Sequence, residues 1–276
     1  MIGGQAYLSV CTPYRDDASY LQEWIEFHRL VGVDRFYLYN NGSSDDHRKI
    51  LAPYVERGIA TVYDWPIPAI GDTGRPSGII RAFDHCVERH RNDSRWIAFI
   101  DIDEFLFSPG PGTVSALLID YEGSPGIAVH RAEFGTSGHR TRPAGLVIEN
   151  YVHRAKQDPD SRAYFKSIVD PLQVTRCASV HHFLYRDGFA VDENRIPVVT
   201  GIRAEKTFVS FSRLRINHYR TKSEEELSRK LELWEDAGKL QMEPPTIRLK
   251  MAALHERDET ITTYVPPLQD ALRGDN

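Results

Sequence analysis

Cysteine is scarce in this sequence, and long apolar runs are absent. Only three cysteines occur among the 276 residues, namely Cys11, Cys86 and Cys177. Because they are few, odd in number and far apart, they predict neither a disulfide framework nor a zinc site and favour a reducing compartment. No stretch approaches the ~18 apolar residues of a membrane-spanning helix, and residues 1–10 do not resemble a signal peptide. We therefore expect a cytoplasmic protein without an integral membrane segment.

A strong excess of one charge is also missing. The 39 acidic residues slightly outnumber the 34 basic ones, which gives a net charge of −5. This balance provides no electrostatic basis for binding nucleic acid or an anionic membrane surface. The composition, with 41% hydrophobic and 26% charged residues, is that of an ordinary globular protein. One large domain of this length can bury roughly three quarters of the unfolded chain's surface without any covalent staple.

Short apolar segments alternate with helical patterns over residues 1–110. Residues 19–31 carry apolar side chains at helical spacing, and Gly32 is expected to end this helix in a left-handed conformation. A turn is expected at Thr12-Pro13-Tyr14. The expected strands are residues 6–10, 35–39, 59–63 and 96–100. This alternation predicts an α/β fold with a doubly wound, mostly parallel sheet flanked by helices.

The rest of the chain has weaker patterns. Residues 126–216 are rich in Gly, Pro, Arg and His and contain strand-like runs whose spatial order the sequence does not give. Ser223 followed by Glu226 forms a capping box that predicts the start of a helix, and Gly238 is expected to end it. Pro266-Pro267 and the polar C-terminus indicate a frayed tail.

The most informative motif is Asp101-Ile102-Asp103, which directly follows the apolar residues 96–100. Open α/β sheets bind ligands at the carboxyl ends of their strands, so these two carboxylates are expected where a substrate binds. Acidic side chains at positions i and i+2 can converge on one divalent cation, which prefers oxygen ligands and bridges diphosphate oxygens. Two solvated turn aspartates are the structural alternative, and the placement after a buried strand favours the metal site.

Two other polar clusters contain residue types that suit the same ligand. In residues 215–222, His218 offers a nitrogen ligand for a manganese-type site. Lys222 lies near a helix N-terminus, where exposed N–H groups and the helix dipole favour an anion such as a diphosphate. A core-edge histidine followed by a basic cap is the structural alternative for this segment. Residues 40–45, Asn-Asn-Gly-Ser-Ser-Asp, can hydrogen-bond a nucleoside or form a plain turn.

An ordered set of segments resembles glycosyltransferase family 92 and its bacterial relatives in the wider family 2-like group with the GT-A fold. The matching segments are residues 20–28, Gly32-Val33, residues 36–41, the D-x-D-E-F motif at 101–105, and residues 134–139, 165–169, around His181 and 218–223. The resemblance implies a GT-A domain over residues 1–240, with a donor half at 1–110 and an acceptor half at 111–220. A C-terminal helical extension and tail would follow at 241–276.

The resemblance also implies a reaction and its partners. It implies a metal-dependent, inverting transfer of a hexose from a nucleoside diphosphate sugar, often a UDP-sugar, to a glycan or lipid-linked glycan in polysaccharide biosynthesis. A lipid-linked acceptor would require peripheral membrane contact. Mn²⁺ or Mg²⁺ would be held by Asp101, Asp103 and His218. The implied donor-binding residues are Thr12, Tyr14, Arg15, Asn40, Arg81, Asp101 and Ile102.

Inversion calls for a group that takes the proton of the acceptor hydroxyl. Glu133 is the candidate, with Asp187 and His181 as rivals, and a surface glutamate paired with an arginine is the structural alternative. Relatives often have an aromatic residue where Arg131 stands, which bears on the acceptor and not on the donor. Lys222 would offset charge that develops on the leaving diphosphate.

Three other functions fit parts of the pattern. A haloacid-dehalogenase-type phosphatase also has D-x-D after a buried strand, but there the motif follows the first strand, and Phe105 stands where Thr or Val is expected. A sugar nucleotidyltransferase needs a glycine-rich basic loop after its first strand, whereas residues 11–15 read Cys-Thr-Pro-Tyr-Arg. A catalytically inactive glycan- or nucleotide-binding module of the same fold is the last alternative. The joint presence of the acidic pair, His218 and Lys222 speaks against it.

Overall fold

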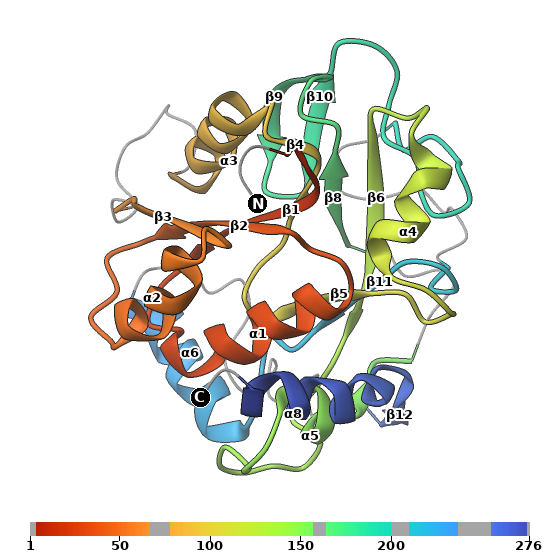
Figure 1. The fold of residues 1–276 in the computed structure, drawn as a ribbon. Coiled ribbons are helices and arrows are strands. Elements are labelled where there is room, and N and C mark those ends of the chain that lie inside the picture. The colour runs from red at the N-terminus through yellow and green to blue at the C-terminus, as the bar shows by residue number, and fades with distance from the viewer. Residues whose placement is uncertain (1–3, 67–77, 157–163, 200–209, 237–254, 275–276) are drawn as a thin grey trace.

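An eight-stranded mixed sheet forms the centre of the protein (Figure 1). The computed structural model describes residues 4–66, 78–156, 164–199, 210–236 and 255–274. The strands lie in the order β3-β2-β1-β4-β8-β6-β11-β5. Their bounds are β1 (Ala6–Tyr14), β2 (Arg35–Asn40), β3 (Ala60–Asp64), β4 (Ser94–Phe99), β5 (Glu104–Phe107), β6 (Gly126–Glu133), β8 (Phe165–Val169) and β11 (Arg215–His218).

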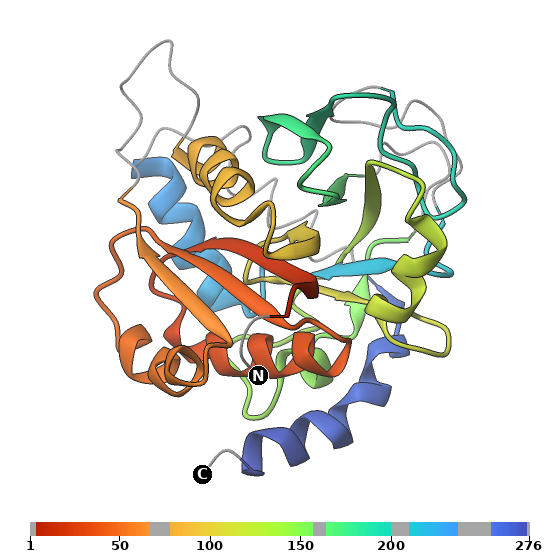
Figure 2. The same cartoon turned by 45° about the horizontal axis from the view of Figure 1, so that its top comes forward.

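The N-terminal half of the sheet is parallel. β3, β2, β1 and β4 pair in parallel, and the helices between them are α1 (Ala18–Leu30), α2 (His47–Glu56) and α3 (Gly78–His90). α1 and α2 lie on one face of the sheet and α3 on the other (Figures 1 and 2). Beyond β4 the pairing is mixed, since β8 is antiparallel to both β4 and β6, and β11 is parallel to β6 and antiparallel to β5. The predicted α/β architecture, a mostly parallel sheet flanked by helices, is confirmed.

The core has two layers, one on each face of the sheet. On β4, Trp96 and Ala98 pack into the cluster on the side of α1, while Ile97 and Phe99 pack into the cluster that includes α3. A strand buried on both faces reads as a continuous apolar run, which is why residues 96–100 show no alternation. The three cysteines are free and buried, and all belong to the second cluster.

β1 is longer than predicted. The expected turn at Thr12-Pro13-Tyr14 is wrong, because β1 pairs with β2 as far as Tyr14. Pro13 is tolerated for a geometric reason. Cys11 accepts a hydrogen bond from Ile100 on the β4 side, and alternation along the strand directs Pro13 to that same side. There β4 has already ended at Phe99, so the missing N–H of the proline leaves no ladder bond unmade.

Gly32 ends α1 as predicted. Its φ is +99°, and the N–H of Val33 donates to the carbonyl of His28 over 2.9 Å. A Cβ at this position would lie 2.1 Å from the Ser115 hydroxyl oxygen. Both the backbone conformation and the lack of space therefore require glycine here.

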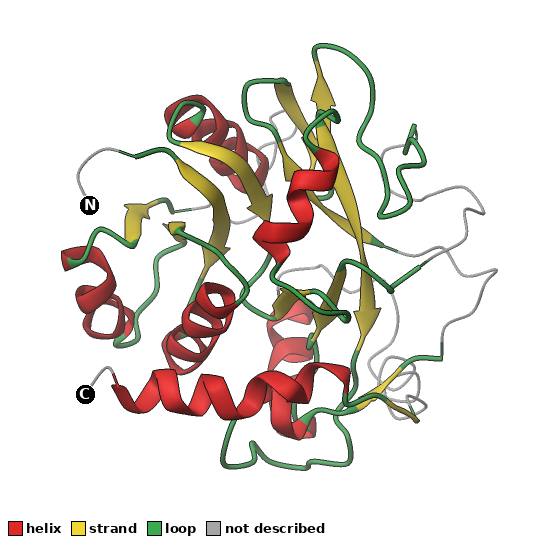
Figure 3. Cartoon of the chain, turned by 45° about the vertical axis from the view of Figure 1, so that its right-hand side comes forward, coloured by secondary structure: helices red, strands yellow, loops and turns green. Residues whose placement is uncertain are grey.

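The C-terminal helices pack on the sheet and on α1. The capping box is confirmed, because the N–H of Ser223 donates to the Glu226 carboxylate and the N–H of Glu226 donates to the Ser223 hydroxyl, at the start of α6 (Glu224–Asp236). The frayed tail expected at Pro266-Pro267 is wrong. Both prolines fall in the first turn of α8 (Val265–Gly274), where backbone N–H groups have no intrahelical partner. α8 lies beside α1 (Figures 1 and 3).

Smaller elements complete the described structure. They are α4 (Val114–Leu118), η1 (Ile119–Tyr121), α5 (Val147–Asn150), β7 (His153–Arg154), β9 (Val174–Ser179), β10 (His182–Tyr185), β12 (Glu256–Arg257) and η2 (Thr260–Tyr264). The helix end expected at Gly238 and residues 241–254 of the extension expected from residue 241 lie outside the described residues. Within the described ranges, every helix is too short or too polar to cross a membrane.

Candidate active site

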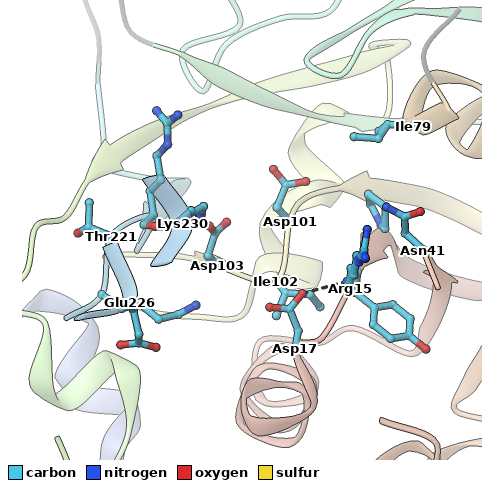
Figure 4. A pocket seen from close by; sticks show the side chains of 14 residues that line it. Arg15, Asp17, Asn41, Ile79, Asp101, Ile102, Asp103, Thr221, Glu226 and Lys230 are labelled. Carbon is cyan, nitrogen blue, oxygen red and sulfur yellow. Dashed lines mark hydrogen bonds and ion pairs between the residues drawn. The ribbon is translucent and has the colours of Figure 1, made fainter. Parts of the chain in front are cut away.

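A cavity of about 540 Å³ opens at the carboxyl ends of β1, β2 and β4, next to the start of α6. Figure 4 shows Asp101 between Asp103 and Lys230 on one side and Arg15 and Asn41 on the other. Its walls come from five places in the sequence. The lining residues are Pro13, Tyr14, Arg15 and Asp17 at and after the end of β1, Asn41 after β2, Ile79 in α3, Asp101, Ile102 and Asp103 after β4, and Arg220, Thr221, Lys222, Glu226 and Lys230 around the start of α6.

The two aspartates of the motif each pair with a lysine. Oδ2 of Asp101 lies 2.7 Å from Nζ of Lys166, a β8 residue. Oδ2 of Asp103 lies 3.0 Å from Nζ of Lys230, a residue of α6. The backbone of the loop is also fixed, because the N–H of Asp101 donates to the Glu104 carboxylate and the carbonyl of Asp103 accepts from Tyr219. The motif thus presents two oriented carboxylates to the cavity.

Both aspartates are held in the ionised form. Burial by itself would raise the pKa of Asp101, but the Lys166 ammonium outweighs it and the pKa lies below its ordinary value. Burial also opposes ionisation of Asp103, yet Lys230 and His218 bring its pKa well below the ordinary value. Two carboxylates that stay ionised at neutral pH are suited to bind a cation.

His218 is the last residue of β11 and is nearly buried. Its Nδ1 lies 2.7 Å from Oε2 of Glu133, and its Nε2 lies 3.4 Å from Oδ1 of Asp103. Burial would lower the pKa of this imidazole, but the two carboxylates outweigh burial and raise it to about 9. The imidazole therefore connects Glu133 on β6 with the acidic pair.

Comparison with known proteins decides the family. The sequence profile of glycosyltransferase family 92 matches residues 6–263. The chain belongs to glycosyltransferase family 92. It is 35% identical over 187 residues to a family 92 glycosyltransferase of Oryza sativa subsp. japonica, a match that covers 66% of this chain and 30% of that protein. The chain thus spans about a third of the length of this curated relative.

Two further similarities are more distant. The beta-1,4-galactosyltransferase galt-1 of Caenorhabditis elegans is 25% identical over 190 residues, which covers 63% of this chain and 42% of that protein. Among solved structures, S. aureus TarS, residues 1–349, is similar at 13% identity with a TM-score of 0.40, over 87% of this chain and 68% of that one.

Not all predicted donor-binding residues of the family 92 chain line the cavity. Tyr14, Arg15, Asp101 and Ile102 do so. The Tyr14 hydroxyl is buried without a hydrogen-bond partner among the described residues.

The other three predicted donor contacts lie outside this lining. Thr12 is fully buried and donates to the carbonyl of Pro13. Asn40 is bonded to Asp64 and to the N–H of Ser43, while its neighbour Asn41 faces the cavity. Arg81 is exposed on α3.

Glu133 does not line the cavity of the family 92 chain either. Oε2 is bonded to His218, and Oε1 lies 3.2 Å from the guanidinium of Arg131. Burial would raise the Glu133 pKa, but His218 and Arg131 outweigh it and lower the pKa to about 2. A carboxylate with so low a pKa is a weak base. The geometry therefore favours the structural alternative, a glutamate paired with an arginine.

The two rivals of Glu133 also lie outside the cavity lining. Nδ1 of His181 lies 3.0 Å from the carbonyl oxygen of Phe165. Burial, together with Lys166 and Arg131, lowers the pKa of His181 to about 4. Asp187 is exposed in the loop after β10. Neither side chain is placed to take a proton from a molecule inside the cavity.

The predicted metal ligands fit a divalent cation by their chemistry. Within the described ranges, no three His, Cys, Asp or Glu side chains are gathered closely enough to form a metal-binding cluster. Asp103 and His218 face each other, while Asp101 contacts Lys166. Two carboxylates and an imidazole are a donor set that suits Mn²⁺. The ammonium groups of Lys166 and Lys230 already pair with one oxygen of each carboxylate, so a metal ion would bind beside these lysines or displace them.

Three side chains of the site were missed by sequence reasoning. Lys230 is seven residues after Ser223 and therefore on the same face of α6. This spacing could have predicted that Lys230 lies on the cavity side of the helix. Lys166 is a single basic residue in the strand Phe-Lys-Ser-Ile-Val, which signals a buried cation in need of a partner. Asp17 lines the cavity, and burial raises its pKa to about 6. No sequence signal marks Asp17.

Lys222 lies in the cavity as predicted, in an unusual conformation. Its φ is +49°, and its Nζ lies 3.8 Å from the centroid of the Tyr20 ring. Burial lowers its pKa, although Asp103 opposes that effect. A lysine held in the left-handed region at a cavity wall is a strained position, of the kind that clusters at functional sites.

Proposed function

We propose that this family 92 chain transfers a hexose from a UDP-sugar to a glycan acceptor, with inversion and with Mn²⁺ or Mg²⁺ as cofactor. One observation carries the proposal. A single cavity has an acidic pair, Asp101 and Asp103, and two lysines, Lys222 and Lys230, opposite a polar loop at the ends of β1 and β2. That combination suits a diphosphate between a divalent cation and ammonium groups, with the nucleoside toward the sheet.

The parts of the cavity correspond to the parts of the donor. Tyr14, Arg15 and Asn41 would contact the nucleoside, because all three line the cavity where β1 and β2 end. Lys222 and Lys230 would contact the diphosphate. The C. elegans relative named as a beta-1,4-galactosyltransferase supports a hexose, and galactose is the first sugar to test.

The metal would be held by Asp101, Asp103 and His218. When bound, it supplies positive charge to the diphosphate as the bond to the sugar breaks. Lys222 and Lys230 add to this stabilisation at fixed positions, where charge develops on the leaving group. The lysines are preorganised because Lys222 packs on Tyr20 and Lys230 contacts Asp103.

The chemical step requires a proton acceptor. The acceptor hydroxyl oxygen forms a bond to the anomeric carbon, the carbon–oxygen bond to the diphosphate breaks, and the hydroxyl proton passes to a base. Asp17 is the cavity carboxylate best suited to this role, because it is ionised at neutral pH yet has a pKa raised to about 6. Asp101 and Asp103 are held by lysines, and Glu226 caps α6.

A thermal-shift screen of nucleotide sugars tests the donor class. The melting temperature is measured with each of a panel of nucleotide sugars, with and without Mn²⁺. A ligand at 100 times its Kd stabilises by about 2.7 kcal/mol, which raises the melting temperature by several degrees. We expect the largest shift with a UDP-hexose and only when Mn²⁺ is present. Equal shifts with and without the metal would contradict the proposed cofactor.

A further inference from the structure

We propose that Glu133 is a positioning residue that fixes the imidazole of His218 so that its Nε2 faces the metal site. The inference rests on the proposed metal-dependent function. It gives Glu133 a task different from that of a general base, and the two tasks have different experimental signatures.

The first support is the hydrogen bond at the far side of the imidazole. Nδ1 of His218 lies 2.7 Å from Oε2 of Glu133. An ionised carboxylate accepts only, so Nδ1 must carry the proton in this bond. In the neutral imidazole that binds a metal, the lone pair is then on Nε2. Nε2 is the atom that faces Asp103, at 3.4 Å.

The second support is that both residues lie on rigid elements. His218 and Glu133 are partners in the parallel register of β11 and β6. The N–H of Phe134 donates to the carbonyl of His218 over 2.9 Å, which continues the ladder past the pair. A carboxylate on a strand beside the imidazole limits both the tautomer and the ring orientation.

The third support is that Glu133 is itself held in place. The guanidinium of Arg131 lies 3.2 Å from Oε1 of Glu133 and 2.7 Å from the carboxylate of Glu104. Glu104 is fully buried and lies 3.4 Å from Lys166, which contacts Asp101. A chain of alternating charges thus links the two aspartates. It runs from Asp103 through His218, Glu133, Arg131, Glu104 and Lys166 to Asp101. Arg131 is the cation that connects Glu133 to this network.

The two roles of Glu133 predict different dependence on metal concentration. Loss of a positioning carboxylate typically costs 10–100-fold in metal affinity, and the lost turnover should return when Mn²⁺ is raised to saturation. Loss of a general base typically costs ~10²–10⁴-fold in rate, and no concentration of Mn²⁺ restores it. The affinity for Mn²⁺ is the readout that a base would leave unchanged.

The test is calorimetric titration of Mn²⁺ into the full chain saturated with UDP, for the wild type and two variants. We expect Glu133→Ala to bind Mn²⁺ about 10–100-fold more weakly. Glu133→Gln, whose side-chain oxygen can still accept from Nδ1, should fall between that variant and the wild type. Melting temperatures show that each variant is folded, and the isosteric Glu133→Gln serves if Glu133→Ala does not fold.

Asp258→Asn is the matched control. Asp258 is a buried carboxylate paired with Arg154 and with Arg215 of β11, so this variant also disturbs an ion pair on the same strand but should leave Mn²⁺ affinity unchanged. Wild-type affinity in both Glu133 variants would overturn the inference while the metal assignment stands. A wild type that binds no Mn²⁺ would overturn the metal assignment and the inference with it. If Asp258→Asn loses as much Mn²⁺ affinity as the Glu133 variants, the loss reflects general destabilisation of the protein, and this result would also overturn the inference.

Discussion

Nζ of Lys166 lies 2.7 Å from Oδ2 of Asp101, and this pair joins the two halves of the chain. Lys166 is 1% exposed, on β8, whereas Asp101 follows β4. Burial would lower the Lys166 pKa, but Asp101 and Glu104 outweigh it and raise the pKa. A permanently charged lysine in the sheet therefore sets the position of the first aspartate of the motif.

Lys166→Met should destabilise the fold. Among the described residues, the variant leaves the buried Glu104 with Arg131 alone as its cation, and removing one member of a buried ion pair costs about 3–5 kcal/mol. Urea unfolding measures the free-energy difference. The double variant Lys166→Met/Glu104→Gln, which removes the stranded charge, should recover part of the loss. A single variant as stable as the wild type would contradict this reading of the network.

Lys222→Ala and Lys230→Ala should slow sugar transfer more than they weaken Mn²⁺ binding. Both side chains are placed to stabilise charge on the leaving diphosphate, and removing one such group costs about 10²–10³-fold in turnover. Initial rates of UDP release at saturating donor measure the effect. Arg229→Ala is the control, because Arg229 is exposed on α6 next to Lys230. If either lysine variant has the same rate of UDP release as the control, that lysine does not stabilise the leaving diphosphate and has a structural role.

Asp17→Asn should lower the rate of transfer by about 10²–10⁴-fold with little change in donor affinity. The substitution keeps the shape of the side chain and removes its basicity. In the wild type the rate of transfer should rise with pH as Asp17 ionises around its pKa of about 6. This pH-dependent rise should be absent in the variant. The pH profile of UDP release on both proteins is the measurement. If Glu133→Gln loses rate at saturating Mn²⁺ and Asp17→Asn does not, Glu133 is the base.

His28 should make the fold sensitive to acid. Its ring is fully buried, accepts the N–H of Leu106 and has its pKa lowered to about 3 by burial. Because the unfolded chain binds this proton more readily, the stabilisation is complete above the unfolded pKa of about 6.5 and is lost as pH falls toward 3, by about 1.4 kcal/mol per pH unit. Urea unfolding across this range should give a steeper pH dependence for the wild type than for His28→Gln. If the free energy of unfolding depends on pH equally in the wild type and in His28→Gln, another group determines the sensitivity to acid.

Local sequence was sufficient where neighbouring residues determine the structure. The run at residues 96–100 predicted a doubly buried strand, and the aspartates after it were placed at the sheet edge where the cavity opens. Ser223 and Glu226 predicted a helix start because a capping box needs only four residues. Gly32 predicted a helix end for the same reason.

Contacts between distant parts of the chain were not accessible in this way. Asn40 and Asn41 are adjacent, and which of them faces the cavity depends on where β2 ends and the chain turns. The pairing of Lys166 with Asp101 depends on β8 lying antiparallel to β4, an order that the weak patterns of residues 126–216 do not reveal. The role of Glu133 depends likewise on β6 pairing with β11.

The central claim is that the cavity binds a nucleotide sugar through a metal held by the acidic pair. Its most direct test is Mn²⁺-dependent release of UDP from UDP-galactose and other UDP-hexoses, compared between the wild type and Asp103→Ala. The wild type should release UDP only with Mn²⁺ or Mg²⁺ present, and Asp103→Ala should be folded yet inactive and unable to bind the donor. Equal metal-dependent release and donor binding by Asp103→Ala, or release by the wild type that does not respond to removal of the metal, would contradict the account.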